Sequence, residues 1–115
     1  DGVGHPRPVG RALRVAERAM YLSGRQLSLP DWESLDESSL AIAAAISFGL
    51  LRFYLLALKA ASVVLLRLGR IEESRARLHV LAAVDSRDQL GASKLLEVIA
   101  TFENPDESDL SLVAA

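Results

Sequence analysis

The stretch LRFYLLALKAASVVLLRLGR, residues 51–70, restricts the possible folds more than any other part of the chain. It is almost entirely apolar, but it contains the cations Arg52, Lys59, Arg67 and Arg70. A membrane-spanning helix needs about 20 consecutive, mainly apolar residues, and a central cation costs at least about 2.5 kcal/mol on insertion scales. The longest uncharged run, from Ser38 to Leu51, is shorter than that. We therefore predict a helix at the centre of a helical bundle and no membrane span.

Apolar residues recur at helical spacing along most of the chain, and no segment shows the alternation of a strand. We expect helices near 9–22, 38–48, 50–68, 70–84 and 88–102. Gly24 and Gly69 are expected to end the first and third of these, and Gly49 to separate the second from the third or to lie in a kink. The sequence thus predicts an all-α fold of about five helices arranged as antiparallel hairpins.

Three regions follow from composition. Residues 1–8 are rich in Gly and Pro and are expected to form a flexible arm. Residues 9–103 are expected to form a single helical domain. Residues 104–115 form an acidic tail, which is either disordered or docks on a basic groove of this chain or of a partner.

Several classes of function are disfavoured by what the sequence contains. The formal net charge of −2 argues against nucleic-acid binding. The absence of cysteine excludes disulfides and thiolate metal sites, and fits a cytoplasmic protein. His5 and His79 lack metal-ligand spacing, and no nucleophile motif or phosphate-binding glycine loop is present. We predict no enzyme activity, no metal and no cofactor.

The cations of 51–70 form a stripe. At about 100° per residue, Arg52, Lys59 and Arg70 lie within about 20° of one another, and Arg67 lies about 60° away. One interpretation is that they reach the edge of the helix and pair with acids of neighbouring helices. The other is that they line a groove for an acidic partner segment, because arginine grips carboxylates with two donors. A denser basic cluster around the following turn consists of Arg67, Arg70, Arg75 and Arg77, and is either a solvated surface or a docking patch.

Aromatic residues suggest further contacts. Trp32, the only tryptophan, lies in the predicted loop LPDWESL. It is either an interface anchor at the margin of the cationic stripe or a lid over the helical core. Tyr54 is a candidate for pointing into the same groove, whereas Phe53 is expected in the core.

The segment ALKAASVVLLRLGRIEESRARLHVLAAVDSRD resembles a tetratricopeptide repeat. Leu68-Gly69 occupies the inter-helix position of that family, and Leu65, Ile71 and Leu78 occupy its apolar positions. Ser86 replaces the usual proline and Leu81 a small alanine. The resemblance covers residues 54–88 and, loosely, 12–48, where ALRVAERAMYLSGR echoes ALKAASVVLLRLGR. It implies stacked helix pairs that bind other proteins.

A second resemblance rests on LPDWESLD, LLRFYLLALKAA and LRLGRIEESRARL. These segments are similar to small helical proteins of nitrogen-fixing bacteria, of the nitrogenase-associated factor T type. The resemblance implies an accessory protein that docks on a nitrogenase component, such as the molybdenum–iron protein, and protects it.

The sequence therefore predicts a non-catalytic accessory factor that stabilises a partner protein. Its expected binding residues are Arg52, Lys59, Arg67, Arg70, Arg75, Trp32 and Tyr54. Two alternatives remain open, namely a self-associating structural protein whose long helix forms a homodimer, and a small carrier of apolar ligands.

Overall fold

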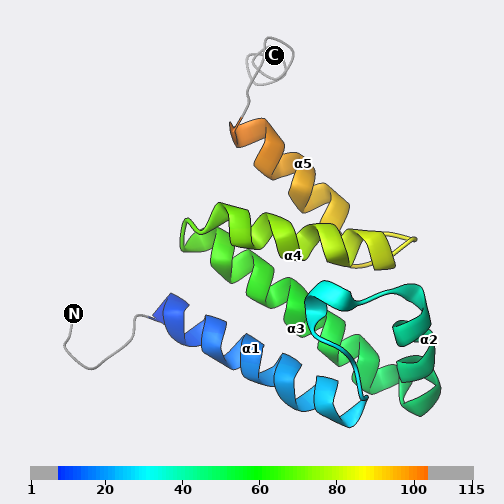
Figure 1. Cartoon of the computed structure of the whole chain (residues 1–115). Coiled ribbons are helices and arrows are strands. Elements are labelled where there is room, and N and C mark those ends of the chain that lie inside the picture. Colours follow the sequence, from blue (N-terminus) through cyan, green and yellow to red (C-terminus); the bar gives the residue numbers. More distant parts are fainter. Residues whose placement is uncertain (1–7, 104–115) are drawn as a thin grey trace.

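The computed structural model describes residues 8–103, and within them the fold is all-α, as predicted (Figure 1). This part of the chain contains five α-helices, one short 3₁₀ helix and no strand. The elements are α1 (Pro8–Gln26), η1 (Trp32–Ser34), α2 (Glu37–Ile46), α3 (Phe48–Arg67), α4 (Ile71–Val84) and α5 (Ala92–Glu103). Pro8, the last residue of the predicted arm, begins α1. Residues 1–7 and the predicted acidic tail, 104–115, lie outside the described part.

Helix α3 is the centre of the structure. Helices α1 and α4 pack along two of its sides, each antiparallel to it, and α5 packs on α4 (Figure 1). The segment 27–36 leaves α1, passes over α3 and places η1 against α4 before it reaches α2. We call the side of α3 that carries this segment the front and the opposite side the rear.

The core lies where α3 meets its neighbours. Leu58 and Leu65 of α3 are fully buried, as are Leu78 and Leu81 of α4. Full burial of a leucine side chain contributes about 1.5–3 kcal/mol. Helix α3 also has the length and apolarity that would allow it to cross a membrane. Its packing between α1 and α4 favours the bundle-centre interpretation instead.

Gly69 ends α3 and begins an antiparallel hairpin, as predicted. Its φ of +80° lies in the left-handed region, where glycine is favoured because it has no Cβ. The Gly69 N–H donates to the Leu66 carbonyl (3.0 Å) and the Arg70 N–H to that of Leu65 (2.9 Å). These two bonds form a Schellman cap, which fixes the direction in which α4 returns along α3.

The prediction that Gly24 ends the first helix is wrong. Helix α1 continues to Gln26, and Gly24 lies inside its last turn, packed against the ring of Tyr54. A Cβ at this position would lie 3.2 Å from Tyr54 Cε2, so glycine allows the close approach of the two helices. Ser28 takes the left-handed position instead, with φ +55°.

The hairpin expected from the looser half of the repeat resemblance, residues 12–48, is also not observed. Helix α1 packs chiefly along α3 and not along α2. The break before α3 occurs at Ser47, whose hydroxyl accepts from the Leu50 N–H (3.1 Å), and Gly49 lies within the first turn of α3. Asp36 caps α2 through a capping box with Ser39, in which the Ser39 N–H donates to the carboxylate (2.8 Å).

The last helix begins at Ala92, later than the expected residue 88. Asp85 accepts hydrogen bonds from the backbone N–H groups of Gln89 (3.0 Å) and Leu90 (2.8 Å). Because these bonds hold the chain in turns, residues 85–91 form a connection and not the start of a helix.

Two candidate binding surfaces on opposite sides of α3

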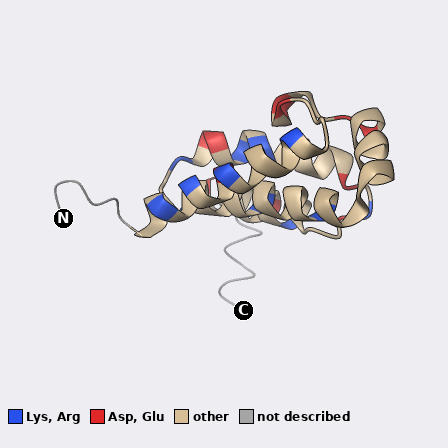
Figure 2. Cartoon of the chain, turned by 90° about the horizontal axis from the view of Figure 1, so that it is seen from below, with Lys and Arg blue, Asp and Glu red and all other residues tan. Residues whose placement is uncertain are grey.

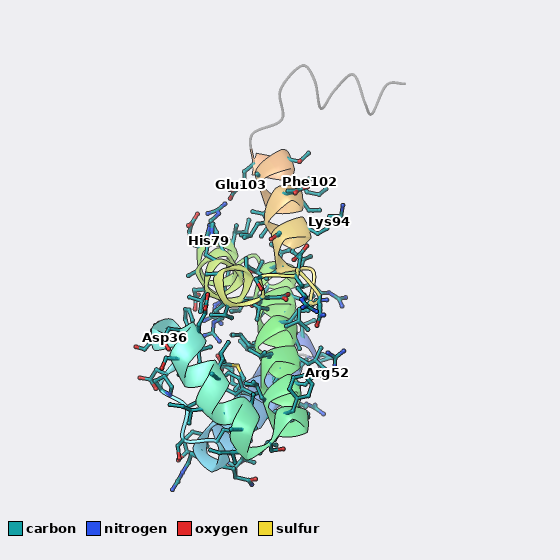
Figure 3. All side chains as sticks on the ribbon, turned by 90° about the vertical axis from the view of Figure 1, so that its right-hand side faces the viewer. Asp36, Arg52, His79, Lys94, Phe102 and Glu103 are labelled. Atoms are coloured by element: carbon teal, nitrogen blue, oxygen red, sulfur yellow. The ribbon has the colours of Figure 1, made fainter. Side chains whose placement is uncertain are left out.

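The predicted cationic stripe forms an exposed surface on the rear of α3. We call Arg52, Leu56, Lys59 and Arg67 the α3 cationic face. Arg52 and Arg67 are exposed, Lys59 is half-buried, and Leu56 between them is 42% exposed. Figure 3 shows Arg52 pointing away from the side on which Asp36 and α2 lie. From Arg52 to Arg67 the face extends about 22 Å, at 1.5 Å per residue.

The cations of the predicted site divide into two groups. Arg70 pairs with Glu73 (2.7 Å), and Arg75 pairs with Glu72 and Glu103. The hydrogen bonds of the Arg70–Glu73 pair raise the pKa of Arg70 and lower that of Glu73. Arg70 therefore follows the first interpretation of the stripe, because its acid, Glu73, lies on the next helix, α4. Arg75, for which a solvated surface or a docking patch was expected, pairs with an acid of its own helix and one of α5.

The cations of the α3 cationic face behave differently. Within residues 8–103, Arg52, Lys59 and Arg67 form no ion pair. Lys59 Nζ lies next to the connection between α4 and α5, 3.9 Å from where a Cβ at Gly91 would be. Asp85 and Asp88 of that connection bind backbone N–H groups. The three cations thus remain without an acidic partner in the described structure.

Exposed apolar side chains accompany these cations. Phe53, expected in the core, is 51% exposed, and Leu56 lies between Arg52 and Lys59. Phe53 is exposed because the buried side of α3 is centred on Tyr54, Leu58 and Leu65. A surface that mixes apolar side chains with arginine has the composition of protein–protein interfaces.

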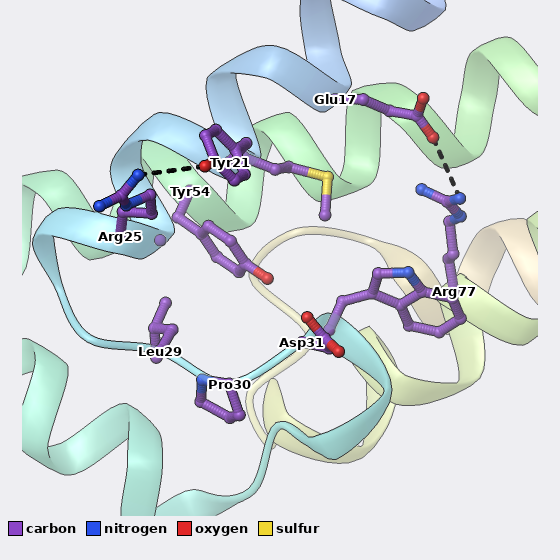
Figure 4. A pocket seen from close by; sticks show the side chains of 11 residues that line it. Glu17, Tyr21, Arg25, Leu29, Pro30, Asp31, Tyr54 and Arg77 are labelled. Carbon is purple, nitrogen blue, oxygen red and sulfur yellow. Dashed lines mark hydrogen bonds and ion pairs between the residues drawn. The ribbon is translucent and has the colours of Figure 1, made fainter.

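Trp32 and Tyr54 do not join this face, in contrast to the sequence prediction. Both lie on the front of α3, where they line a pocket of about 290 Å³ between α1, the 27–36 segment, α3 and α4 (Figure 4). We call it the Trp32 pocket. Its other walls include Glu17, Tyr21, Asp31 and Arg77. The single surface expected from the sequence is therefore divided between two sides of one helix.

Tyr54 forms the floor of the Trp32 pocket. The residue is only 3% exposed, and its ring packs against Gly24. Its hydroxyl points toward the segment that carries Asp31 (Figure 4), and it forms no hydrogen bond to any residue between 8 and 103. Burial, reinforced by the negative charge of Asp31, raises the pKa of Tyr54 to about 12. The hydroxyl is therefore protonated at neutral pH and is available as a donor.

Arg77 of α4 supports the opposite wall. Its guanidinium lies 5.1 Å from the centroid of the Trp32 ring, a cation–π contact, and it pairs with Glu17 at 3.1 Å. Its Nε is buried and has no hydrogen-bond partner among the described residues. At the other end of the pocket, Arg25 donates to the Tyr21 hydroxyl (3.1 Å).

Two groups of residues were not predicted as site residues. Glu17, Asp31 and Arg77 come from three separate elements, so no spacing in the sequence connects them. The exposed arginines of α1, in contrast, could have been predicted to share one helix face from their spacing in the sequence. Arg11, Arg14 and Arg18 follow the i, i+3, i+7 spacing of a single helix face, and Figure 2 shows the basic residues spaced along α1.

No group of His, Cys, Asp and Glu residues between positions 8 and 103 has the arrangement of a metal site.

Comparison with known proteins gives one informative relative. It is described as an uncharacterized 19.8 kDa protein in the nifW 5′ region of Azotobacter chroococcum mcd 1. The two sequences are 44% identical over 90 residues, which are 77% of this chain and 50% of the relative. The chain thus spans about half the length of the curated relative that it matches. No family model and no solved structure matches the chain, so the tetratricopeptide-like arrangement stays a prediction.

Proposed function

We propose that the chain is a non-catalytic accessory factor that binds another protein through the α3 cationic face. The observation that carries the proposal is the set of cations on that face that have no acidic partner among residues 8–103 and are interleaved with exposed apolar side chains. An acidic surface with apolar residues complements it in both charge and hydrophobicity. Arginine is well suited to such a contact because its planar group binds a carboxylate with two hydrogen bonds.

The biological context that we propose is nitrogen fixation. The support is the relative in the nifW 5′ region, together with the similarity to nitrogenase-associated proteins that the sequence itself indicates. The proposed partner is a nitrogenase component, the molybdenum–iron protein, and the proposed location is the cytoplasm. Binding one conformation of the partner would stabilise it by about 2.7 kcal/mol when the factor is present at 100 times its Kd.

A titration of purified molybdenum–iron protein with the tagged chain tests the proposal. The double variant Arg52→Glu/Arg67→Glu reverses two charges of the face and should weaken binding at least tenfold. Both side chains are exposed, so folding should be unchanged, as circular dichroism would verify. Binding by the native chain should also weaken as salt is raised from 50 to 300 mM, because surface charges are then screened.

The matched control is Arg14→Glu/Arg18→Glu, which makes the same change in net charge on the exposed side of α1. Binding that is equally weakened by the control would show a general charge effect and overturn the assignment to α3. Undiminished binding by the Arg52→Glu/Arg67→Glu variant would also overturn it. So would sedimentation at micromolar concentration showing a stable homodimer that buries the α3 cationic face, because such a dimer is the self-associating alternative.

A further inference from the structure

The Trp32 pocket contains polar groups that have no partner among residues 8–103. The Tyr54 hydroxyl opens into the pocket although its residue is 97% buried, as follows from its 3% exposure. Asp31, on the facing segment, makes no side-chain capping bond to η1 and no ion pair with a residue between 8 and 103. A ligand in this pocket thus meets a hydrogen-bond donor from α3 and an acceptor from the 27–36 segment.

The charges around the Tyr54 hydroxyl restrict the kind of ligand. Among the neighbouring charges, Asp31 contributes most to the raised pKa of Tyr54. Arg77 acts in the opposite direction, and Glu33 adds to the effect of Asp31. Arg77 is already engaged by Glu17 and by the Trp32 ring. A carboxylate placed at the hydroxyl would therefore be repelled by Asp31, and the other cation of the lining, Arg25, is bound to the Tyr21 hydroxyl. A simple cation would be attracted by Asp31, but it could not accept the hydrogen bond from Tyr54.

We propose that the Trp32 pocket binds a neutral, planar amide. Its carbonyl oxygen accepts a hydrogen bond from the Tyr54 hydroxyl, its N–H donates to the Asp31 carboxylate, and its flat face lies against the indole of Trp32. Arg77 also lines the pocket, and its guanidinium lies over the Trp32 ring and so helps to position the indole. The amide belongs either to a small molecule or to a peptide, since both carry the same group.

This site lies on the front of α3 and does not depend on the partner proposed for the rear. Binding there would make the chain a receptor for an amide ligand as well as a docking protein. The pocket volume of about 290 Å³ accommodates a side chain or a small ring, and not a cofactor.

The test uses the single tryptophan of the chain, Trp32, as a fluorescent reporter. Three probes share one shape and differ in charge: benzamide is neutral, benzoate is an anion and benzamidinium is a cation. We expect benzamide to change the Trp32 emission saturably, with a Kd in the millimolar range for so small a ligand, and the other two to bind at least fivefold more weakly. N-acetylglutamine N-methylamide is the peptide counterpart, and whichever neutral amide binds more tightly identifies the source.

Amino-acid substitutions test whether binding depends on the two proposed hydrogen bonds or only on the shape of the pocket. Tyr54→Phe should weaken benzamide binding about fivefold, the effect of one hydrogen bond of about 1 kcal/mol, and Asp31→Ala should weaken it similarly. The control is Ser93→Ala, which removes an exposed hydroxyl that does not line the pocket, and this variant should retain the native affinity. The proposal is overturned if neither neutral amide binds saturably, if benzoate or benzamidinium binds as tightly, or if Tyr54→Phe has no effect.

Discussion

The two Schellman caps of this fold allow a reciprocal test of backbone strain. Both place one residue in the left-handed region, Gly69 after α3 and Ser28 after α1. At the second cap, the Leu29 N–H donates to the Gly24 carbonyl at 2.9 Å, in parallel with the bonds at Gly69. The caps thus share one hydrogen-bond pattern but differ in the residue that adopts the strained conformation.

The expected size of the effect follows from this difference. The left-handed conformation is about 1–2 kcal/mol less favourable for a residue with a Cβ. Glycine, in turn, loses about 0.4–1 kcal/mol more conformational entropy on folding than a residue with a side chain. Ser28→Gly should therefore raise the free energy of unfolding by about 0.5–1 kcal/mol, and Gly69→Ser should lower it by a similar amount. No atom lies within 4 Å of a Cβ built at Gly69, so the loss is due to the backbone alone.

Urea unfolding followed by circular dichroism at 222 nm measures both changes, and thermal melts check them, since 1 kcal/mol moves the Tm by about 4–8 °C in a domain of about this size. The double swap Ser28→Gly/Gly69→Ser should lie close to the native chain. Gly49→Ala is the control, because Gly49 has ordinary helical backbone and open space around it, and this variant should be more stable. A neutral Gly69→Ser variant, or a destabilising Ser28→Gly, would refute the description of the caps.

Two further predictions concern single hydrogen bonds. The backbone bond from Ser39 is the main cause that lowers the pKa of Asp36 from its usual 3.8. The stabilisation by this carboxylate is therefore present above that value and is lost as pH falls through the lower folded-state pKa. Asp36→Ala should accordingly unfold at lower urea than the native chain at pH 7, and a difference that does not shrink as the pH is lowered from 7 to 2 would contradict this. Ser74→Ala should lower the free energy of unfolding by about 1 kcal/mol, because the buried Ser74 hydroxyl donates to the Ser62 carbonyl at 2.7 Å, while the exposed Ser93→Ala should change nothing.

Local signals predicted the elements well. The turn at Gly69 is determined by residues close to it in the chain, and the capping role of Asp36 is a property of its own helix start. Gly24 carries the same kind of local signal but lies within a helix. A glycine is needed at this position because the ring of Tyr54, on another helix, packs closely against it. The residues next to Gly24 in the sequence do not indicate this contact.

The candidate site was predicted in part for the same reason. Helix periodicity placed Arg52, Lys59 and Arg67 near one another, because these residues belong to one helix. It could not show that Trp32 would fold over the front of α3, since the position of a loop residue depends on how α1, α3 and α4 pack.

The crossing segment 27–36 has a consequence for the order in which the molecule assembles. Helices α3 and α4 are joined by three residues, 68–70, and can pair through a short loop, whereas α1 meets α3 only after the chain has passed through η1 and α2. Closing the longer loop costs more conformational entropy, so we expect α1 to dock after the α3–α4 hairpin has formed. The Trp32 pocket would be completed in that late step, whereas the cations on the rear of α3 would be in place before it. A chain that has not finished folding would thus present its α3 cationic face earlier than its Trp32 pocket.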